Sequence, residues 1–348
     1  GLQIHLVTQE IENDELLGGD GTLNDVRRLY YRELVARFAH HPALQWNIGE
    51  ENDNTDAQRN QFSQYIRSLD PYDHPTVVHT YYNLRENFAS GPLDVFYDGL
   101  IGSTNFEGTS LQGDATNYNR WAIMFRQQSA AAGQPWVIYG DEQGPAVASD
   151  LSNITQIIRD AMWGNLLGGG AGAEWYFGYQ GCCFGDLQQE SWRVAQPLWQ
   201  RADIAIDFFR AYLPFWEMES ANAITSHSTG ASYTFAKTDE VYAAYFSGGA
   251  ANSPTMNLGN SQQTYDVFWF NPIVGSGLQK GSVHQVVARG DVSLGVPPGD
   301  ASGDWVALLQ IGTPVNEVPV FVDIADTTTV EGGTLNIGIE VIDDDPAI

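Results

Sequence analysis

The chain has 348 residues, of which 43% are hydrophobic and 12% aromatic, and its formal net charge is −27. This apolar content excludes a disordered chain, and the length fits one large domain with a smaller one. So acidic a surface repels phosphate backbones and anionic lipid, so we expect neither nucleic acid nor membrane insertion. Strong acidity with only two lysines indicates a secreted, extracellular protein from a salty environment, where salt screens the self-repulsion.

Residues 1–216 alternate strand and helix patterns. Apolar, β-branched stretches predict strands, and apolar residues at three- and four-residue spacing predict helices. The predicted strands are 2–9, 43–52, 75–82, 106–112, 135–144 and 173–180, and the predicted helices are 23–40, 56–69, 117–133, 154–169 and 191–213. Six strand–helix units in series predict an α/β fold with a parallel sheet, either a barrel or a doubly wound sheet.

Two of these helices carry more specific predictions. In helix 23–40 the spacing of apolar residues predicts a buried face made of Val26, Leu29, Tyr30, Leu34, Val35 and Phe38. Helix 191–213 contains Pro197, which lacks a backbone N–H and is therefore predicted to kink it.

The residues that follow the predicted strands are polar or aromatic. Functional residues of barrels and doubly wound sheets lie at these C-terminal strand ends. The strand ends read TQE (8–10), GEEN (49–52), HTY (79–81), SLQ (110–112), DEQ (141–143) and YFGYQ (176–180). A closed (β/α)8 barrel needs eight strands, so two would have to precede residue 1.

Acidic residues end two of the strands, Glu50 and Glu51 in one and Asp141 and Glu142 in another. Two carboxylates that face each other are the minimum equipment for glycoside hydrolysis, where one protonates the leaving oxygen and the other attacks or activates water. A separation of about 5–5.5 Å would give retention of configuration, and roughly 6.5–9.5 Å would give inversion. Alternatively, acidic residues at loop starts are simply solvated.

These strand ends resemble the 4/7 superfamily of retaining (β/α)8-barrel glycoside hydrolases. In that superfamily the acid/base glutamate ends strand 4 after a glycine and an asparagine, and the nucleophile ends strand 7 as Glu-x-Gly. If GEEN (49–52) is strand 4, the strands ending at 79–81, 110–112, 141–143 and 176–180 count as strands 5 to 8 without a gap. The resemblance then implies a barrel whose first two strands are not in this sequence.

Three longer stretches, LYYRELVARFAHHPALQWNIGEEN, DPYDHPTVVHT and GGGAGAEWYFGY, resemble a secreted bacterial family with such a barrel and a β-domain labelled "putative collagen-binding". The resemblance implies Glu51 as acid/base and Glu142 as nucleophile of a polysaccharide- or oligosaccharide-cleaving enzyme. Glu50 stands where the superfamily usually has the asparagine that binds the sugar 2-hydroxyl. Glu50 as the true acid is therefore an open alternative.

The other strand-end residues are candidates for sugar binding. Amide side chains offer both donor and acceptor to hydroxyls, and aromatic rings stack on the apolar faces of pyranoses. The predicted substrate-binding residues are Gln9, Glu50, Asn52, His79, Tyr81, Gln112, Asp141, Trp175 and Tyr179. For His79 and Trp175 a structural role is equally plausible on the sequence. We expect no cofactor and no metal, and the acidic loop 10–15 is better interpreted as solvated than as a Ca²⁺ site.

Helix periodicity vanishes after Pro214. Short strand patterns separated by Gly, Asn, Pro and Ser predict a β-sandwich over 217–312, and 313–348 reads as a linker and the start of a further β-sandwich, cadherin-like domain. The adjacent Cys182 and Cys183 form either a strained vicinal disulfide or two inert thiols. The alternative to an enzyme is a non-catalytic carbohydrate- or matrix-binding protein.

Overall fold

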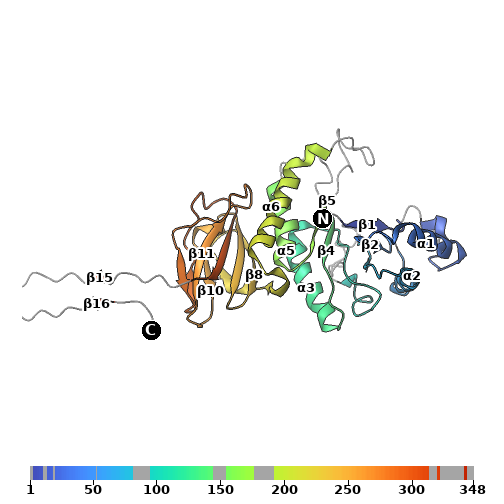
Figure 1. Ribbon diagram of the computed structural model, residues 1–348, viewed down its shortest axis with the longest axis horizontal. Coiled ribbons are helices and arrows are strands. Elements are labelled where there is room, and N and C mark those ends of the chain that lie inside the picture. Colours follow the sequence, from blue (N-terminus) through green and yellow to red (C-terminus); the bar gives the residue numbers. More distant parts are fainter. Residues whose placement is uncertain are drawn as a thin grey trace, which may run out of the picture.

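The computed structural model describes most of the chain, namely residues 3–10, 14–18, 20–51, 53–80, 95–143, 154–175, 192–312, 320–321 and 341–342. These residues form an α/β part followed by an antiparallel β part, with helix α6 (Gln196–Tyr212) between them (Figure 1). Several predicted residues lie outside the described ones, namely Asn52, Tyr81, Tyr179, Cys182 and Cys183.

Parallel strands form the centre of the α/β part. The strands β1 (Ile4–Val7), β2 (Leu44–Asn47) and β3 (Thr76–Val77) pair in that order, and β4 (Tyr139–Gln143) pairs with β5 (Gly172–Trp175). All of these pairs are parallel. Apolar side chains beneath them, among them Leu44, Val77 and Ile138, are almost fully buried, as expected for strands covered by helices.

Residues 107–111 connect β3 to β4. His79 bridges Ser110, Gly108 bridges Val137 and Leu111 bridges Gly140, all in parallel orientation. Parallel pairing therefore runs in chain order from β1 to β5 through six successive stretches of chain, as the alternating pattern predicts. Gly108 is required in this connection, because a Cβ there would lie 2.3 Å from the backbone oxygen of Val137.

Helices cover this sheet, and their order matches the predicted alternation. The α-helices are α1 (Asp25–Phe38), α2 (Asp56–Leu69), α3 (Tyr118–Ala131), α4 (Ile154–Ile157), α5 (Asn165–Leu167) and α6, and a π-helix (Ile158–Gly164) joins α4 to α5. Short 3₁₀ turns occur at Asp14–Leu17, Ala115–Asn117, Trp192–Ala195, Phe215–Glu217, Asn222–Ile224 and Ala250–Asn252. Among the described residues, no helix is long and apolar enough to cross a membrane.

The predicted buried face of α1 is partly wrong. Val26, Leu29 and Phe38 are 57%, 53% and 38% exposed, whereas Arg27 and Tyr31 are fully buried. Arg27 can be buried because its guanidinium donates to Gln9 and lies 4.4 Å from the ring centroid of Phe62. The buried face of the helix is thus rotated from the predicted one toward Arg27, a charged residue that the spacing of apolar residues does not include. Val35 is buried as predicted, and Tyr30 and Leu34 are partly buried.

Pro197 does not kink a helix. It lies in the first turn of α6, whose bounds begin at Gln196. A proline there loses no hydrogen bond, because the first N–H groups of a helix have no intrahelical partner. In place of one kinked helix over 191–213, the structure has the 3₁₀ turn Trp192–Ala195 followed by α6.

The second part of the chain is antiparallel. Its strands are β6 (Glu219–Ser220), β7 (Thr225–Ser226), β8 (Ala231–Lys237), β9 (Val241–Ser247), β10 (Thr255–Asn257), β11 (Thr264–Phe270), β12 (Gln285–Val287), β13 (Asp291–Ser293) and β14 (Trp305–Ile311). They form a six-stranded sheet in the order β12-β11-β14-β9-β8-β6 and a three-stranded sheet in the order β13-β10-β7. Beyond them, β15 (Val320–Phe321) pairs antiparallel with β16 (Val341–Ile342).

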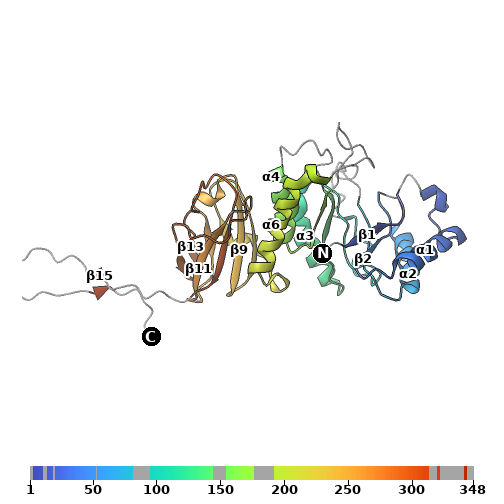
Figure 2. The ribbon, with the colours of Figure 1, turned by 45° about the horizontal axis from the view of Figure 1, so that its top comes forward.

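The six-stranded sheet is buried on both faces. Along β14, Val306 and Leu308 pack into one apolar core, and Trp305, Ala307 and Leu309 pack into another. The first core includes side chains of α6 and of the π-helix, and the second includes residues of the three-stranded sheet. One core therefore joins the two parts of the molecule, as Figure 2 shows with α6 lying against β9. The two antiparallel sheets share the second core, and this arrangement supports the expected sandwich in part.

Candidate active site

Three side chains from successive strand ends meet above the parallel sheet. Glu50 follows β2, His79 follows β3 and Glu142 lies at the end of β4. One oxygen or nitrogen atom from each forms a group in which all atoms lie within 4.8 Å of one another. Glu50 is held by its backbone, whose N–H donates to the carbonyl of Gln9 at 2.9 Å, so β1 supports the same end of the sheet.

Both predicted catalytic glutamates have a left-handed backbone. Glu51 has φ 45° and Glu142 has φ 47°, and only five non-glycine residues among the described ones have positive φ. Such conformations cost free energy for residues with a side chain and are enriched at functional sites. At Glu142 the register between β4 and β5 also shifts, between Gly140 and Gln143. The regular alternation of side chains therefore ends at these two positions.

The carboxylate of Glu142 has two nitrogen groups beside it. The amide of Gln112 donates to Oε2, and Nε2 of His79 lies 3.7 Å from the same oxygen. Burial, together with the negative charges of Glu50 and Asp141, raises the pKa of Glu142 to about 9, while His79 acts to lower it.

His79 is buried, and its two ring nitrogens face different partners. Nδ1 lies 3.2 Å from Oγ of Ser110 and 3.4 Å from Oδ2 of Asp141, and Nε2 has no hydrogen-bond partner among the residues that the structure describes. Burial by itself lowers the pKa of His79, but the hydrogen bond and charge of Asp141 outweigh it and raise the pKa to about 9. His79 is therefore an imidazolium at neutral pH.

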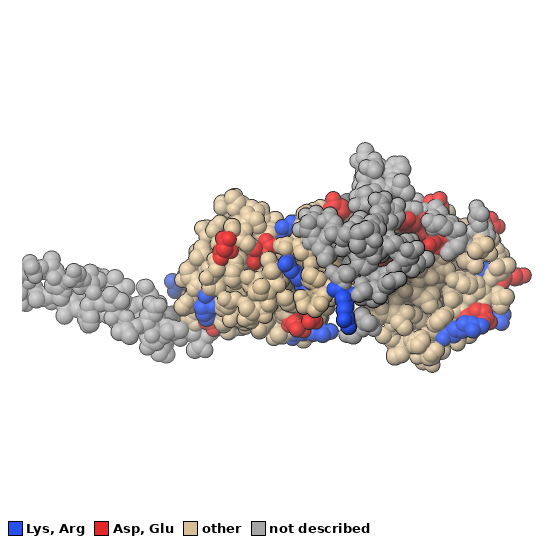
Figure 3. Space-filling view, turned by 90° about the horizontal axis from the view of Figure 1, so that it is seen from above, with Lys and Arg blue, Asp and Glu red and all other residues tan. Residues whose placement is uncertain are grey.

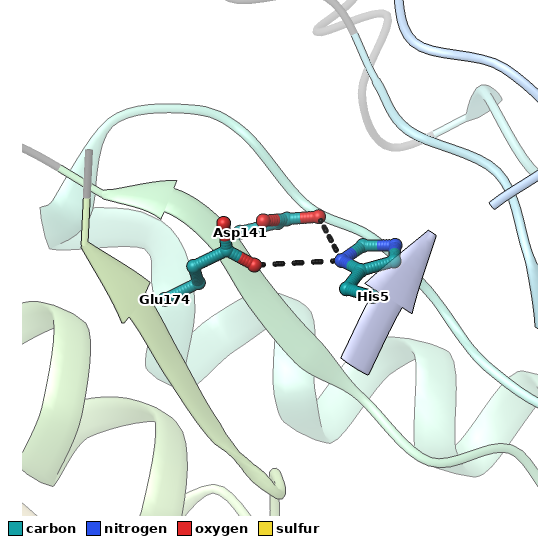
Figure 4. Close-up of side chains that lie close together, drawn as sticks. All are labelled: His5, Asp141 and Glu174. Carbon is teal, nitrogen blue, oxygen red and sulfur yellow. Dashed lines mark hydrogen bonds and ion pairs between the residues drawn. The ribbon is translucent and has the colours of Figure 1, made fainter. Parts of the chain in front are cut away.

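A second group lies next to the first. Nδ1 of His5 on β1 is 3.1 Å from Oδ2 of Asp141 on β4 and 3.4 Å from Oε2 of Glu174 on β5, as Figure 4 shows. Ser110 also donates its hydroxyl to Asp141. Against the effect of burial, the two histidines hold the pKa of Asp141 well below its usual range, and the two carboxylates raise that of His5 to about 10.

A histidine with two carboxylates is a familiar donor set for divalent cations. Here both imidazoles carry raised pKa values and hydrogen-bond to Asp141. A protonated imidazole has no lone pair to donate to a metal ion. Each imidazole thus has a carboxylate as its ion-pair partner.

The other predicted site residues differ in what they contact. Gln9 is buried, and both ends of its amide bond to protein groups, Asn54 and Arg27. Gln112 has a buried oxygen without a partner. Trp175 packs against the core that contains α6, so its ring is used at least partly in packing. Glu51 directly follows Glu50 and is partly buried, but it is not in the group formed by Glu50, His79 and Glu142.

Three residues of these two groups were not among the predicted ones, namely His5, Ser110 and Glu174. His5 had a signal in the sequence, because it interrupts an otherwise apolar strand pattern. Ser110 stands in the predicted strand end SLQ (110–112). Glu174 had no signal, since only the curvature of the sheet brings β1 near β5. A cavity of about 460 Å³ lies elsewhere, along α3 and Asn222, and none of the strand-end residues lines it.

On the face of the α/β part that Figure 3 shows, several acidic side chains lie beside a few basic ones. A neutral ligand such as a sugar suits this environment better than a phosphorylated or sulfated one, because like charges repel.

Comparisons with known proteins bear on the fold. No protein-family model and no curated protein matches the chain. The crystal structure of a "putative glycoside hydrolase" from Bacteroides vulgatus ATCC 8482 resembles it with a TM-score of 0.54 at 14% identity, over 90% of this chain and 60% of that one. An α-amylase from Geobacillus thermoleovorans in complex with acarbose, with a TM-score of 0.44, 9% identity and coverages of 83% and 65%, is too weakly similar to show a shared fold.

The first likeness shows the fold alone: a mixed helix and sheet architecture that resembles a glycoside hydrolase fold. The chain spans about 60% of the length of that protein.

Proposed function

We propose that the protein is a retaining glycoside hydrolase that acts on a polysaccharide or oligosaccharide. The observation that carries the proposal is the group of Glu50, His79 and Glu142, with its atoms within 4.8 Å of one another at the ends of parallel strands. Retaining enzymes hold their two carboxyl groups about 5–5.5 Å apart, closer than inverting enzymes do. The structural neighbour described as a glycoside hydrolase supports the same class of reaction.

Glu142 is the proposed nucleophile. Its oxygen attacks the anomeric carbon, the glycosidic C–O bond breaks, and the departing oxygen takes a proton from the acid. Water then releases the sugar after giving a proton to the same residue. Glu142 attacks in its ionised form, which the N–H groups of Gln112 and His79 beside it favour. Burial and the facing Glu50 favour the protonated form at rest, so Glu142 loses its proton before it attacks.

The acid/base residue is one of two neighbours. The resemblance to the 4/7 superfamily supports Glu51, with Glu50 in the place of the asparagine that binds the sugar. The proximity of Glu50 to Glu142 supports Glu50 itself as the acid. Asn52, Tyr81 and Tyr179 remain proposed sugar contacts.

For the fold, we propose a (β/α)8 barrel whose third to eighth strands are the six parallel stretches. Two observations support this proposal: chain-order parallel pairing and side chains from β1, β4 and β5 that meet across the interior. Closure would need two further strand–helix units between β5 and β1. The proposed domains are residues 1–216, 217–312 and 313–348, in a secreted bacterial protein that binds neither nucleic acid nor membranes.

The test is hydrolysis of a panel of glycans by the longest soluble form of the protein, measured as release of reducing ends. We expect one glycan class to be cleaved and Glu142→Ala to abolish its cleavage with the fold intact by circular dichroism. Glu33→Ala, which removes an exposed glutamate paired with Arg37 on α1, is the control and should leave the rate unchanged. Binding of a glycan without hydrolysis would favour the alternative, a non-catalytic carbohydrate-binding protein.

A further inference from the structure

Asp141 lies between the two groups of titratable side chains. Its Oδ2 accepts from Ser110 and lies 3.1 Å from Nδ1 of His5 and 3.4 Å from Nδ1 of His79. Asp141 also fixes the backbone of its neighbour, because its Oδ1 accepts from the N–H of Glu142 at 3.0 Å. One buried carboxylate thus contacts the residue proposed as nucleophile and both histidines.

We propose that Asp141 is a positioning residue that keeps His79 protonated and directs its Nε2–H at Glu142. This inference rests on the proposed function and deepens it. His5 holds Asp141 from the opposite side, and Glu174 balances the charge of His5.

The geometry allows one orientation of His79 to do this. Since Nδ1 faces Asp141 and Ser110, Nε2 points the other way, toward Oε2 of Glu142 at 3.7 Å. Nε2 is buried and, within the described part of the chain, has no hydrogen-bond partner. A buried N–H without a partner costs free energy, so this proton is available to an oxygen that moves closer during the reaction.

The charges around Glu142 determine how the imidazolium of His79 affects its ionisation. Glu50 and Asp141 oppose ionisation of Glu142, and His79 favours it. His5 acts on Asp141, and Glu174 acts on His5. During the reaction Glu142 gains a bond to the anomeric carbon and loses its charge, and it regains the charge when water releases the sugar. His79 keeps its proton throughout, and its positive charge favours the return of the carboxylate.

The first test follows the histidines directly. The chain has seven histidines, so a pH titration of imidazole nitrogens by NMR, with assignment of the signals by His79→Gln and His5→Gln, separates the relevant two. We expect His79 to stay protonated above pH 7.5 in the native chain and Asp141→Asn to lower its pKa by more than one unit. A native His79 that loses its proton near pH 6.5, or one that Asp141→Asn leaves unchanged, would overturn the inference.

The second test is the pH profile of kcat/KM. In Asp141→Asn a neutral His79 no longer lowers the pKa of Glu142, and this effect is larger than the opposite effect of removing the charge of Asp141. The acidic limb should therefore move to higher pH. Asp70→Asn is the matched control, because Asp70 also bonds a buried histidine, His74 at 2.8 Å, but at the opposite end of the strands, before β3. It should cost stability and leave the pH profile and the titration of His79 as in the native chain.

Two further results complete the test. If Asp141→Asn does not fold, His5→Gln is used in its place. This substitution removes the positive charge of His5 on the other side of Asp141, so the pKa of His79 should rise. An unchanged pKa of His79 would contradict the inference. Absence of any hydrolysis would overturn the proposed function together with this inference. Hydrolysis by a protein whose His79 is neutral would overturn the inference alone.

Discussion

Two adjacent glutamates, Glu50 and Glu51, compete for the role of proton donor. The positive φ of Glu51 turns the chain directly after Glu50, so alternation along the strand does not decide which of the two side chains faces Glu142. Glu50 is the one that meets Glu142 and His79. Both a proton donor and a residue that binds the sugar would lie close to the nucleophile. The proximity of Glu50 to Glu142 therefore does not decide between these two roles, and a functional test is needed.

We expect the hydrolysis rates of Glu50→Gln and Glu51→Gln to depend differently on the leaving group of the substrate. The variant that lacks the acid should lose on the order of 10²–10⁴-fold in rate on the natural glycan. It should lose far less on an aryl glycoside whose departing group needs no proton, and azide should restore its turnover. The other variant should be impaired on both substrates and not respond to azide. Steady-state kinetics of both variants on both substrates decide the assignment, and identical behaviour would contradict it.

At the scale of elements, the π-helix connects the two parts of the molecule. Trp163 lies in it, fully buried, and its ring packs against Phe208 of α6 and Tyr245 of β9 with centroids 5.4 Å and 5.3 Å apart. Asp160 of the same helix pairs with Arg159 and accepts from Tyr233 of β8 at 3.0 Å. The antiparallel sheet therefore packs on the helix that precedes β5, one of the strands beside the site.

Trp163→Ala should lower the free energy of unfolding by about 3–5 kcal/mol, because it leaves a cavity in the shared core. We also expect the native chain to unfold in one transition and the variant in two, since this core couples the α/β part to the antiparallel part. Urea unfolding followed by fluorescence and circular dichroism measures both effects. Trp216→Ala is the control: Trp216 is 71% exposed, and its removal should change stability by less than about 0.5 kcal/mol.

For the whole molecule, the net charge of −27 contrasts with an interior that holds buried imidazolium groups. The pKa values of His5 and His79 are raised to about 10 and about 9, so the folded chain keeps protons that the unfolded chain releases near pH 6.5. Their stabilising effect is complete below pH 6.5 and is lost as pH rises through the folded values. The raised pKa of Glu142 also stabilises the folded chain at low pH, and this stabilisation is lost as the pH rises from about 4.5 to about 9.

The free energy of unfolding should therefore fall between pH 6.5 and 9, by up to about 1.4 kcal/mol per pH unit for each retained proton. Denaturant unfolding at a series of pH values measures this slope. A chain with both His5→Gln and His79→Gln should show a weaker dependence in the same interval. Constant or rising stability over this interval in the native chain would contradict the prediction.

The alternation of strands and helices up to residue 216 and the change to short strands afterwards could be predicted from the sequence, because periodicity reports which faces are buried. The positions of Glu50, His79 and Glu142 at strand ends followed from the same pattern. The buried face of α1 could not be predicted, since Arg27 is buried only because Gln9 and Phe62 receive its guanidinium.

The sequence by itself thus determined the order of elements and the strand ends at which the polar residues stand. Only the tertiary structure decided which of them meet. His5 and Glu174 are 169 residues apart, and they contact each other because the curvature of the sheet brings β1 near β5. Local propensity acts over a few residues, whereas such contacts depend on how all six parallel stretches pack, which no single stretch encodes.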